Sequence, residues 1–118
     1  MNATQQGDNL VMRFEALELS LQLIRALTGI VRRIQQHDAE EARQMRTAAS
    51  SVSRNLAEGR ARAGKDRTHL YRIAAGSAEE VRAGLLIAGA WGWVSDDEVG
   101  AAMQLVDRLC AILWRLTH

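Results

Sequence analysis

The stretch that decides the fold runs from Arg46 to Gly59 and reads RTAASSVSRNLAEG. Counting from just before it, apolar residues recur every three or four positions, at Ala42, Met45, Ala49, Val52 and Leu56. This spacing predicts an α-helix with one narrow buried stripe. Because most residues of the stripe are small, we expect a neighbouring helix to approach closely. Gly59 is then predicted to supply the left-handed residue that ends the helix.

Composition indicates an all-α protein. The 118 residues suffice for one domain with a single core. Hydrophobic residues make up 47% of the chain, aromatic residues only 4%, and proline is absent. A core of Leu, Ile, Val and Ala is typical of packed helices and argues against a sandwich or barrel. We therefore expect an up-and-down antiparallel four-helix bundle with left-handed packing.

Start and stop signals divide the chain. Residues 1–7 lack periodicity and predict a disordered tail, so the bundle domain is expected over 8–118. Asp38, Asp66 and Ser95 stand where helix N-caps are needed, and Ser95 with Glu98 has the form of a capping box. Gly92 is expected to close the third helix. The predicted helices span about 9–36, 39–58, 66–91 and 96–117.

A second segment, IAAGSAEE at Ile73–Glu80, carries a family resemblance together with the first. The run Asn55–Gly59, the pair Gly76-Ser77 and the turn Trp91–Ser95 resemble the bacterial four helix bundle protein family. Its founding members are encoded by intervening sequences within 23S ribosomal RNA genes, and a related branch is the accessory protein of diversity-generating retroelements. The resemblance implies an up-and-down bundle assembled into a ring-shaped homopentamer, with a protein partner in the retroelement branch.

The first helix offers more apolar residues than one stripe needs. A heptad-like stripe predicts its core face, at Leu10, Phe14, Leu17, Leu21, Ile24, Val31 and Ile34. Other apolar residues on the first and last helices fall off the predicted core stripes and are expected at an oligomer interface: Leu19, Leu23, Ile30, Leu105, Ile112 and Trp114. A homo-oligomer follows, and the resemblance makes five subunits the preferred count.

Positive charge is concentrated in one segment. Residues 43–72 contain eight basic and two acidic residues, whereas the whole chain carries a net charge of +1. The candidates for weakly sequence-specific binding to an RNA or DNA backbone are Arg43, Arg46, Arg54, Arg60, Arg62, Lys65 and Arg67. The alternative is that these side chains are solvated or paired with acids of the later helices, because no groove-reading motif accompanies them.

Polar residues border the stripe of the second helix. On a helical wheel Asn55 and Glu58 lie beside Ser51. They are either functional or part of a polar network that braces this helix against Gly76-Ser77. Under the second interpretation, replacing Glu58 by alanine lowers stability. The glycines inside the third helix, Gly76, Gly84 and Gly89, predict close helix packing.

No catalytic constellation is recognisable, and the sequence predicts no enzyme activity, no metal site and no cofactor. His37, His69 and His118 share no site, and the lone Cys110 is expected to be a buried thiol. No segment is long and apolar enough to span a membrane, so a cytoplasmic protein is expected. The predicted function is an oligomeric scaffold that presents its basic segment to RNA or DNA, and the alternative is a structural or protein-interaction module.

Overall fold

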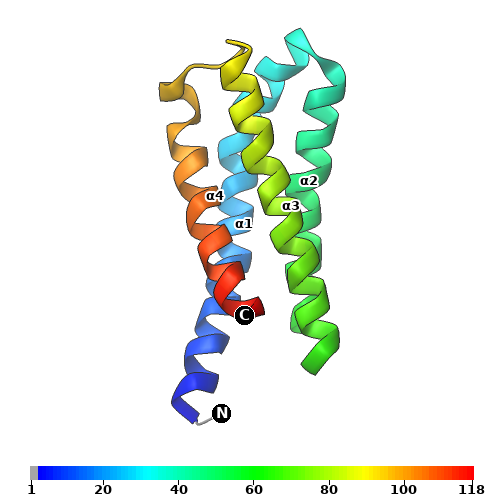
Figure 1. Cartoon of the computed structure of the whole chain (residues 1–118), viewed down its shortest axis with the longest axis vertical. Coiled ribbons are helices and arrows are strands. Elements are labelled where there is room, and N and C mark those ends of the chain that lie inside the picture. The colour runs from blue at the N-terminus through cyan, green and yellow to red at the C-terminus, as the bar shows by residue number, and fades with distance from the viewer. Residues whose placement is uncertain (1–2) are drawn as a thin grey trace.

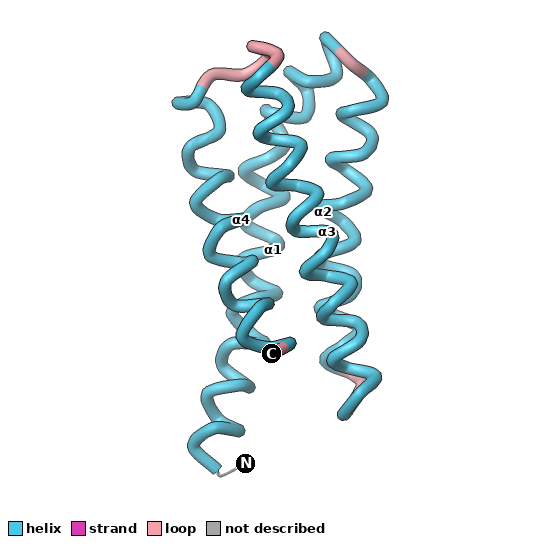
Figure 2. The backbone as a smooth tube through the Cα atoms, viewed as in Figure 1, coloured by secondary structure: helices cyan, strands magenta, loops and turns pink. Residues whose placement is uncertain are grey.

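Four antiparallel helices form the protein. The computed structural model describes residues 3–118, with side chains from Leu10 onward. The helices are α1 (Ala3–His37), α2 (Ala39–Arg60), α3 (Gly64–Ala90) and α4 (Asp96–Thr117), and short loops join them (Figures 1 and 2). Each helix packs on the helices next to it in the chain, and α1 also packs on α4. The predicted all-α, up-and-down four-helix bundle is confirmed.

The helix ends differ from the predicted ends mainly at α1 and α3. The predicted tail covers Met1 and Asn2, which lie outside the described residues, and 3–7, which belong to α1. In Figure 1 the first turns of α1 extend beyond the end of α4. The N-caps Asp38 and Ser95 are confirmed, because each side chain accepts the backbone N–H three residues on. Asp66 is not a cap, since α3 already begins at Gly64, whose φ is +59°.

The end of α3 is a Schellman motif centred on Gly92, as predicted. Gly92 has a φ of +76°, and the N–H groups of Gly92 and Trp93 donate to the carbonyls of Gly89 and Ala88. Trp93, which follows Gly92 in this motif, stacks its ring on two neighbouring rings. The ring centroids lie 5.8 Å apart for Trp93 and His37 and 5.9 Å apart for Trp93 and Trp91. The turn thereby joins the end of α1 to the link between α3 and α4.

Gly59 does not end α2 through a left-handed conformation. It lies inside the helix without a positive φ, and α2 continues to Arg60. A Cβ atom added at Gly59 would lie 2.4 Å from Cε1 of Tyr71, a ring that is 2% exposed. The residue is therefore small because the Tyr71 ring of α3 packs directly on its backbone. The predicted close approach of α2 and α3 is confirmed, and the prediction that Gly59 ends α2 through a left-handed conformation is wrong.

The glycines of α3 contribute less to that approach than predicted. Gly84 meets Met45 of α2, whose Cε atom would lie 2.7 Å from an added Cβ. An added Cβ at Gly76 or Gly89 would meet nothing within 4 Å, so no close contact inside the chain explains these two. The prediction of close packing is right for Gly84 and wrong, within one chain, for Gly76 and Gly89.

The core face of α1 lies about a quarter turn from the predicted face. Leu19, Leu23 and Ile30, predicted at an oligomer interface, are buried in the bundle core, as is Ile112 of α4. Part of the predicted stripe faces outward instead: Leu10, Phe14 and Leu21 are exposed, and Leu17 and Ile24 are half-buried. We call Leu10, Phe14, Leu17 and Leu21 the outer stripe of α1. The small residues Ala16 and Ser20 face the core with Leu19 and Leu23, which lets α1 approach α2.

The remaining predicted interface residues lie on α4. Leu105 is half-buried against the core, and Trp114 is exposed, with its ring stacked on His118 at 4.5 Å. The exposed large apolar side chains of the described residues lie on α1, on α3 with the turn after it, and on α4: Leu10, Val11, Phe14, Leu21, Ile73, Leu86, Ile87, Trp91 and Trp114. No helix within residues 3–118 has the length and hydropathy needed to cross a membrane.

Candidate nucleic-acid interface

Most of the predicted basic residues near the loop between α2 and α3 have partners within the chain. Arg62 pairs with Glu58 at 3.4 Å, and Nε of Arg67 donates to the carbonyl of Gly59 at 3.1 Å. The guanidinium of Arg60 lies 4.5 Å from the centroid of the Phe14 ring. Lys65 is exposed and makes no ion pair with a described residue. The loop is also shorter than predicted, because it spans only residues 61–63.

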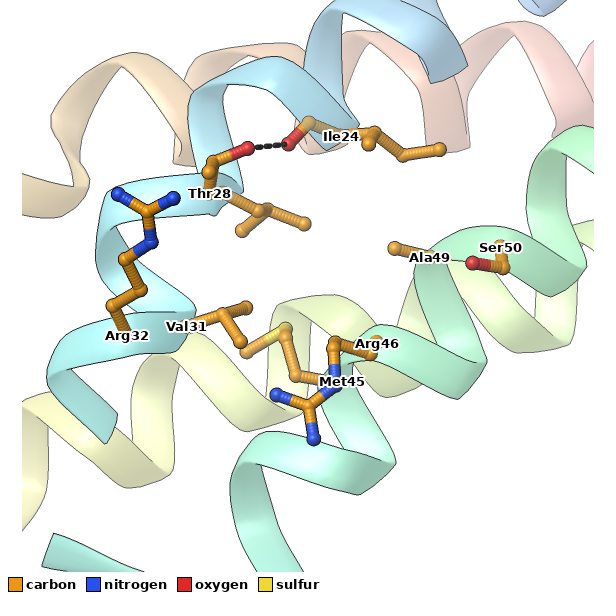
Figure 3. A pocket seen from close by; sticks show the side chains of 9 residues that line it. Ile24, Thr28, Val31, Arg32, Met45, Arg46, Ala49 and Ser50 are labelled. Atoms are coloured by element: carbon orange, nitrogen blue, oxygen red, sulfur yellow. Dashed lines mark hydrogen bonds between the residues drawn. The ribbon is translucent and has the colours of Figure 1, made fainter. Parts of the chain in front are cut away.

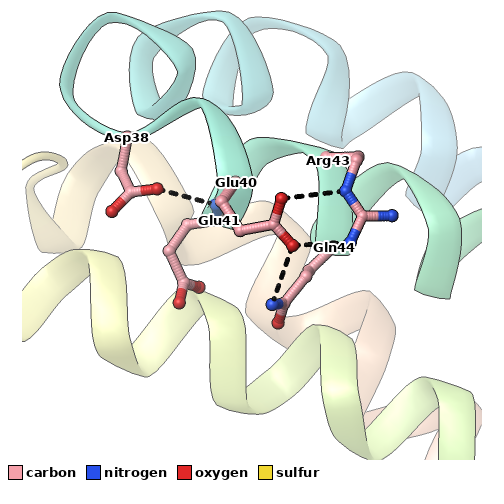
Figure 4. Close-up of polar contacts among 5 residues, drawn as sticks. All are labelled: Asp38, Glu40, Glu41, Arg43 and Gln44. Atoms are coloured by element: carbon pink, nitrogen blue, oxygen red, sulfur yellow. Dashed lines mark hydrogen bonds and ion pairs between the residues drawn. The ribbon is translucent and has the colours of Figure 1, made fainter.

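Arg43 is held at the start of α2. Its Nε donates to Oε2 of Glu40 at 2.9 Å, in the turn that Asp38 caps (Figure 4). This hydrogen bond, together with one from Gln44, lowers the pKa of Glu40 to about 2. Glu40 therefore remains charged at neutral pH, and Arg43 is occupied by it.

A stronger concentration of unpaired positive charge lies on the face shared by α1 and α2. Neither 19–37 of α1 nor 42–57 of α2 contains Asp or Glu, and the two segments together carry six arginines. Arg33 pairs with Glu98 of α4, and Arg43 pairs with Glu40. The other four are exposed and form no ion pair with any described residue: Arg25, Arg32, Arg46 and Arg54.

Between the two helices, this face contains a groove with an apolar floor. Its volume is about 360 Å³, and it is lined by Ile24, Leu27, Thr28, Val31, Arg32, Met45, Arg46, Ala49 and Ser50. Figure 3 shows Arg32 from α1 and Arg46 from α2 beside the aliphatic side chains. The Thr28 hydroxyl is bonded to the carbonyl of Ile24, and Nη1 of Arg46 donates to Gln35. We call this site the α1–α2 groove.

A shallow polar depression on α2 continues the groove. It shares Arg46 and Ser50 with the groove and is otherwise lined by Thr47, Ser51, Arg54 and Asn55. Arginines and hydroxyl groups side by side are suited to bind phosphate oxygens, the arginines by charge and the hydroxyls by hydrogen bonds. Of the predicted basic residues, the structure thus brings Arg46 and Arg54 together, whereas the loop residues lie at the end of α2.

Arg25 and Arg32 were missed because charge was counted along one segment of the chain. The signal that would have found them is the absence of acidic residues from 19–37, which is visible in the sequence. This absence of acidic residues matters because residues 19–37 of α1 lie beside the basic part of α2. That adjacency follows from the bundle order.

The predicted polar network exists, with one member different. The Ser77 hydroxyl of α3 donates to the Ser51 hydroxyl of α2 at 2.8 Å, and Nδ2 of Asn55 donates to the Ser51 carbonyl at 2.8 Å. A second polar contact joins Ser53 of α2 to Ser20 of α1 at 2.9 Å. Glu58 is exposed and pairs with Arg62 of the loop that follows α2, so it does not brace α2 against α3.

Replacing Glu58 by alanine should therefore change the free energy of unfolding by no more than about 0.5 kcal/mol, the usual range for an exposed pair four residues apart on a helix. Replacing Ser51 by alanine should cost about 1–2 kcal/mol, because the buried Ser77 hydroxyl then loses its acceptor. Urea unfolding of both variants measures the difference. A Glu58→Ala variant that is less stable than Ser51→Ala would contradict this assignment.

Groups with catalytic or metal-binding potential are dispersed. Among the described side chains, no three His, Cys, Asp or Glu residues are grouped so as to hold a metal ion. Cys110 is half-buried, and this burial raises the pKa of its thiol to about 12. The thiol is thus protonated at neutral pH and a poor nucleophile.

The fold defines a small four-helix bundle protein with exposed arginines on α1 and α2. The family model of the 23S rRNA-intervening sequence protein matches residues 8–115, and the chain belongs to this family. A crystal structure of a protein of unknown function from the S23 ribosomal protein family of Bacteroides thetaiotaomicron is similar in fold. Its TM-score is 0.75 at 13% sequence identity, and the match covers 90% of this chain and 97% of that one. No curated protein matches the chain.

Proposed function

We propose that the protein is a non-catalytic, homo-oligomeric scaffold that binds the phosphate backbone of RNA or DNA through the face shared by α1 and α2. The observation that carries the proposal is that Arg32 and Arg46 line the α1–α2 groove and Arg54 lines the depression beside it, with no acidic residue on either helix segment. Charges of one sign on one surface attract a polyanion because each neutralised phosphate releases a counterion. Binding of this kind is weakly sequence-specific, since phosphate contacts carry no base information.

A second candidate function is a structural or protein-interaction module, and the outer stripe of α1 favours it. Leu10 and Phe14 are 57% and 59% exposed, more than a side chain packed in a monomer core. Contiguous apolar surface of this kind marks a contact with another protein. The two functions are compatible, because the outer stripe serves assembly while the arginines remain free. A pentameric ring is the preferred assembly on family resemblance.

Replacing Arg32, Arg46 and Arg54 together by glutamine should abolish most nucleic-acid binding. The matched control is the triple variant Arg60→Gln, Arg62→Gln and Lys65→Gln, which removes the same charge from the loop end of α2. Each lost phosphate contact lowers the slope of log K against log salt by roughly 0.7–0.9, so the groove triple should lower it by about two. The loop triple should keep most of the parent slope.

The measurement is fluorescence anisotropy of labelled RNA and DNA oligonucleotides between low and physiological salt, with circular dichroism as the check of folding. A parent protein that binds neither oligonucleotide at low salt overturns the proposed function. Equal slopes for the parent and the groove triple place the contact elsewhere, and loss in the loop triple alone assigns it to the loop.

A further inference from the structure

We propose that the α1–α2 groove takes single-stranded nucleic acid, with an unstacked base against its apolar floor and the flanking phosphates on Arg32, Arg46 and Arg54. This inference rests on the proposed function and names the form of nucleic acid that the same site prefers. Its basis is the composition of the groove, which combines an aliphatic floor with cationic rims.

The floor is apolar across both helices. Leu27 and Val31 of α1 face Met45 and Ala49 of α2, and all four are buried parts of the core whose outermost atoms line the groove. The volume of about 360 Å³ falls within the range of roughly 300–1,000 Å³ typical of small-ligand sites. The groove is therefore large enough for a flat aromatic group such as a base, which would pack on the half-buried Ile24 and on the outermost atoms of the other floor residues.

The rims carry the charges that a nucleotide strand needs. Arg32 stands on one side of the floor and Arg46 on the other, while Arg54 follows Arg46 by eight residues, a rise of about 12 Å along α2. An extended strand of a few nucleotides covers such a distance. Phosphates beside an inserted base can thus reach Arg32 and Arg46 at the groove, and the next phosphate along the strand can reach Arg54 in the adjoining depression.

A duplex does not complement this site. Its outer surface presents phosphates and sugars, and its base faces are hidden by stacking. A duplex can neutralise the arginines, but it leaves the floor uncovered. A single strand satisfies both parts, because its bases have free faces that pack on protein side chains while the backbone follows the cationic track. Charge and shape therefore favour the single strand.

A second copy of this chain is a less suitable occupant of the groove. In an isologous contact the arginines at its rims would find no acidic partner, because the facing segments of α1 and α2 contain none. In the heterologous contact of a ring, the acids would have to come from another part of the chain. The outer stripe of α1 offers a second copy an apolar surface in which Leu10, Phe14 and Leu21 are exposed. We therefore assign the groove to nucleic acid and the outer stripe to assembly.

Three labelled probes of equal length separate the contributions: a 12-nucleotide oligouridine, an abasic strand with the same number of phosphates, and a 12-base-pair RNA duplex. The full chain should bind the oligouridine roughly tenfold more tightly than the abasic strand, the gain expected if a packed base removes about 55 Å² of apolar surface from water. When affinities are compared for the same number of phosphates, the duplex should bind no more tightly than the abasic strand. Equal affinities of the oligouridine and the abasic strand overturn the inference while leaving the proposed function intact.

Filling the groove provides the second test. In the variant Thr28→Leu, one exposed residue that lines the groove but not the polar depression is enlarged without loss of charge. The matched control Gln36→Leu adds one leucine at an exposed position of the same helix outside the groove. The filled variant should lose the tenfold preference for oligouridine and keep its binding to the abasic strand, whereas the control keeps both. A filled variant that retains the preference, or that changes the mass of the assembly in light scattering, overturns the assignment.

Discussion

Replacing Gly59 by alanine should destabilise the bundle by about 2–3 kcal/mol, although alanine is the better helix former. The added Cβ would lie 2.4 Å from Cε1 and 2.9 Å from Cδ1 of Tyr71, well inside van der Waals contact. The Tyr71 ring cannot turn away easily, because it is only 2% exposed and is packed within the bundle core. Overpacking of a buried ring therefore outweighs the gain in helix propensity.

Chemical unfolding measures the effect, and Gly76→Ala is the matched control. Gly76 also lies inside a helix, but an added Cβ there meets nothing within 4 Å. The control should be more stable than the parent by about 0.5–1 kcal/mol, because alanine loses less backbone entropy on folding. If both variants gain stability, the close packing of Tyr71 on Gly59 is wrong.

The helix boundaries were largely predictable because they depend on local chemistry. Asp38 and Ser95 accept hydrogen bonds from backbone N–H groups only three residues away, and Gly92 adopts the left-handed conformation that its residue type favours. Such signals are complete within a few residues of sequence. The number of helices and their order along the chain followed from them.

The rotation of α1 was not predictable from its own sequence, because two of its faces are apolar. The stripe through Leu10, Phe14 and Leu21 and the stripe through Leu19, Leu23 and Ile30 both have helical spacing. The small residues Ala16 and Ser20 decide between them, since they let the backbone of α1 approach α2 and Ser53. This contact joins two helices, so the sequence of α1 alone does not reveal it. Judged by apolar spacing alone, the stripe with the larger side chains is the better candidate for the core face.

The role of Gly59 was mistaken for a similar reason. A glycine near the end of a helical pattern usually marks a left-handed cap. The local sequence gives no sign that Gly59 instead makes room for a side chain of another helix. The partner that requires it, Tyr71, lies twelve residues later on the next helix. The basic face was found only in part, because Arg46 and Arg54 belong to a visibly basic segment whereas Arg32 gains its meaning from the packing of α1 on α2.

Replacing Phe14 by aspartate should dissociate the assembly and leave each subunit folded. Phe14 is 59% exposed in the outer stripe of α1, and Arg60 beside it can pair with the new carboxylate. In an assembly the same charge would be buried in an apolar contact, which is strongly unfavourable. Light scattering of the parent should give a mass near five times the 13.1 kDa chain, and the variant should give a mass close to one chain.

The contrasting variant is Ile112→Asp, at a residue that the sequence placed on the subunit surface. Ile112 is 8% exposed and packs in the core, so a carboxylate there has no water and no basic partner in the core cluster. An unpaired buried charge costs roughly 3–5 kcal/mol or more, a large part of the 5–15 kcal/mol that stabilises a domain of this size. Circular dichroism should therefore show loss of helix for Ile112→Asp and none for Phe14→Asp. An Ile112→Asp variant that is folded but dissociated would show that Ile112 lies at the subunit interface after all.

A parent protein that is a stable monomer at micromolar concentration would contradict the ring proposal, because the outer stripe would then be exposed without a function in assembly.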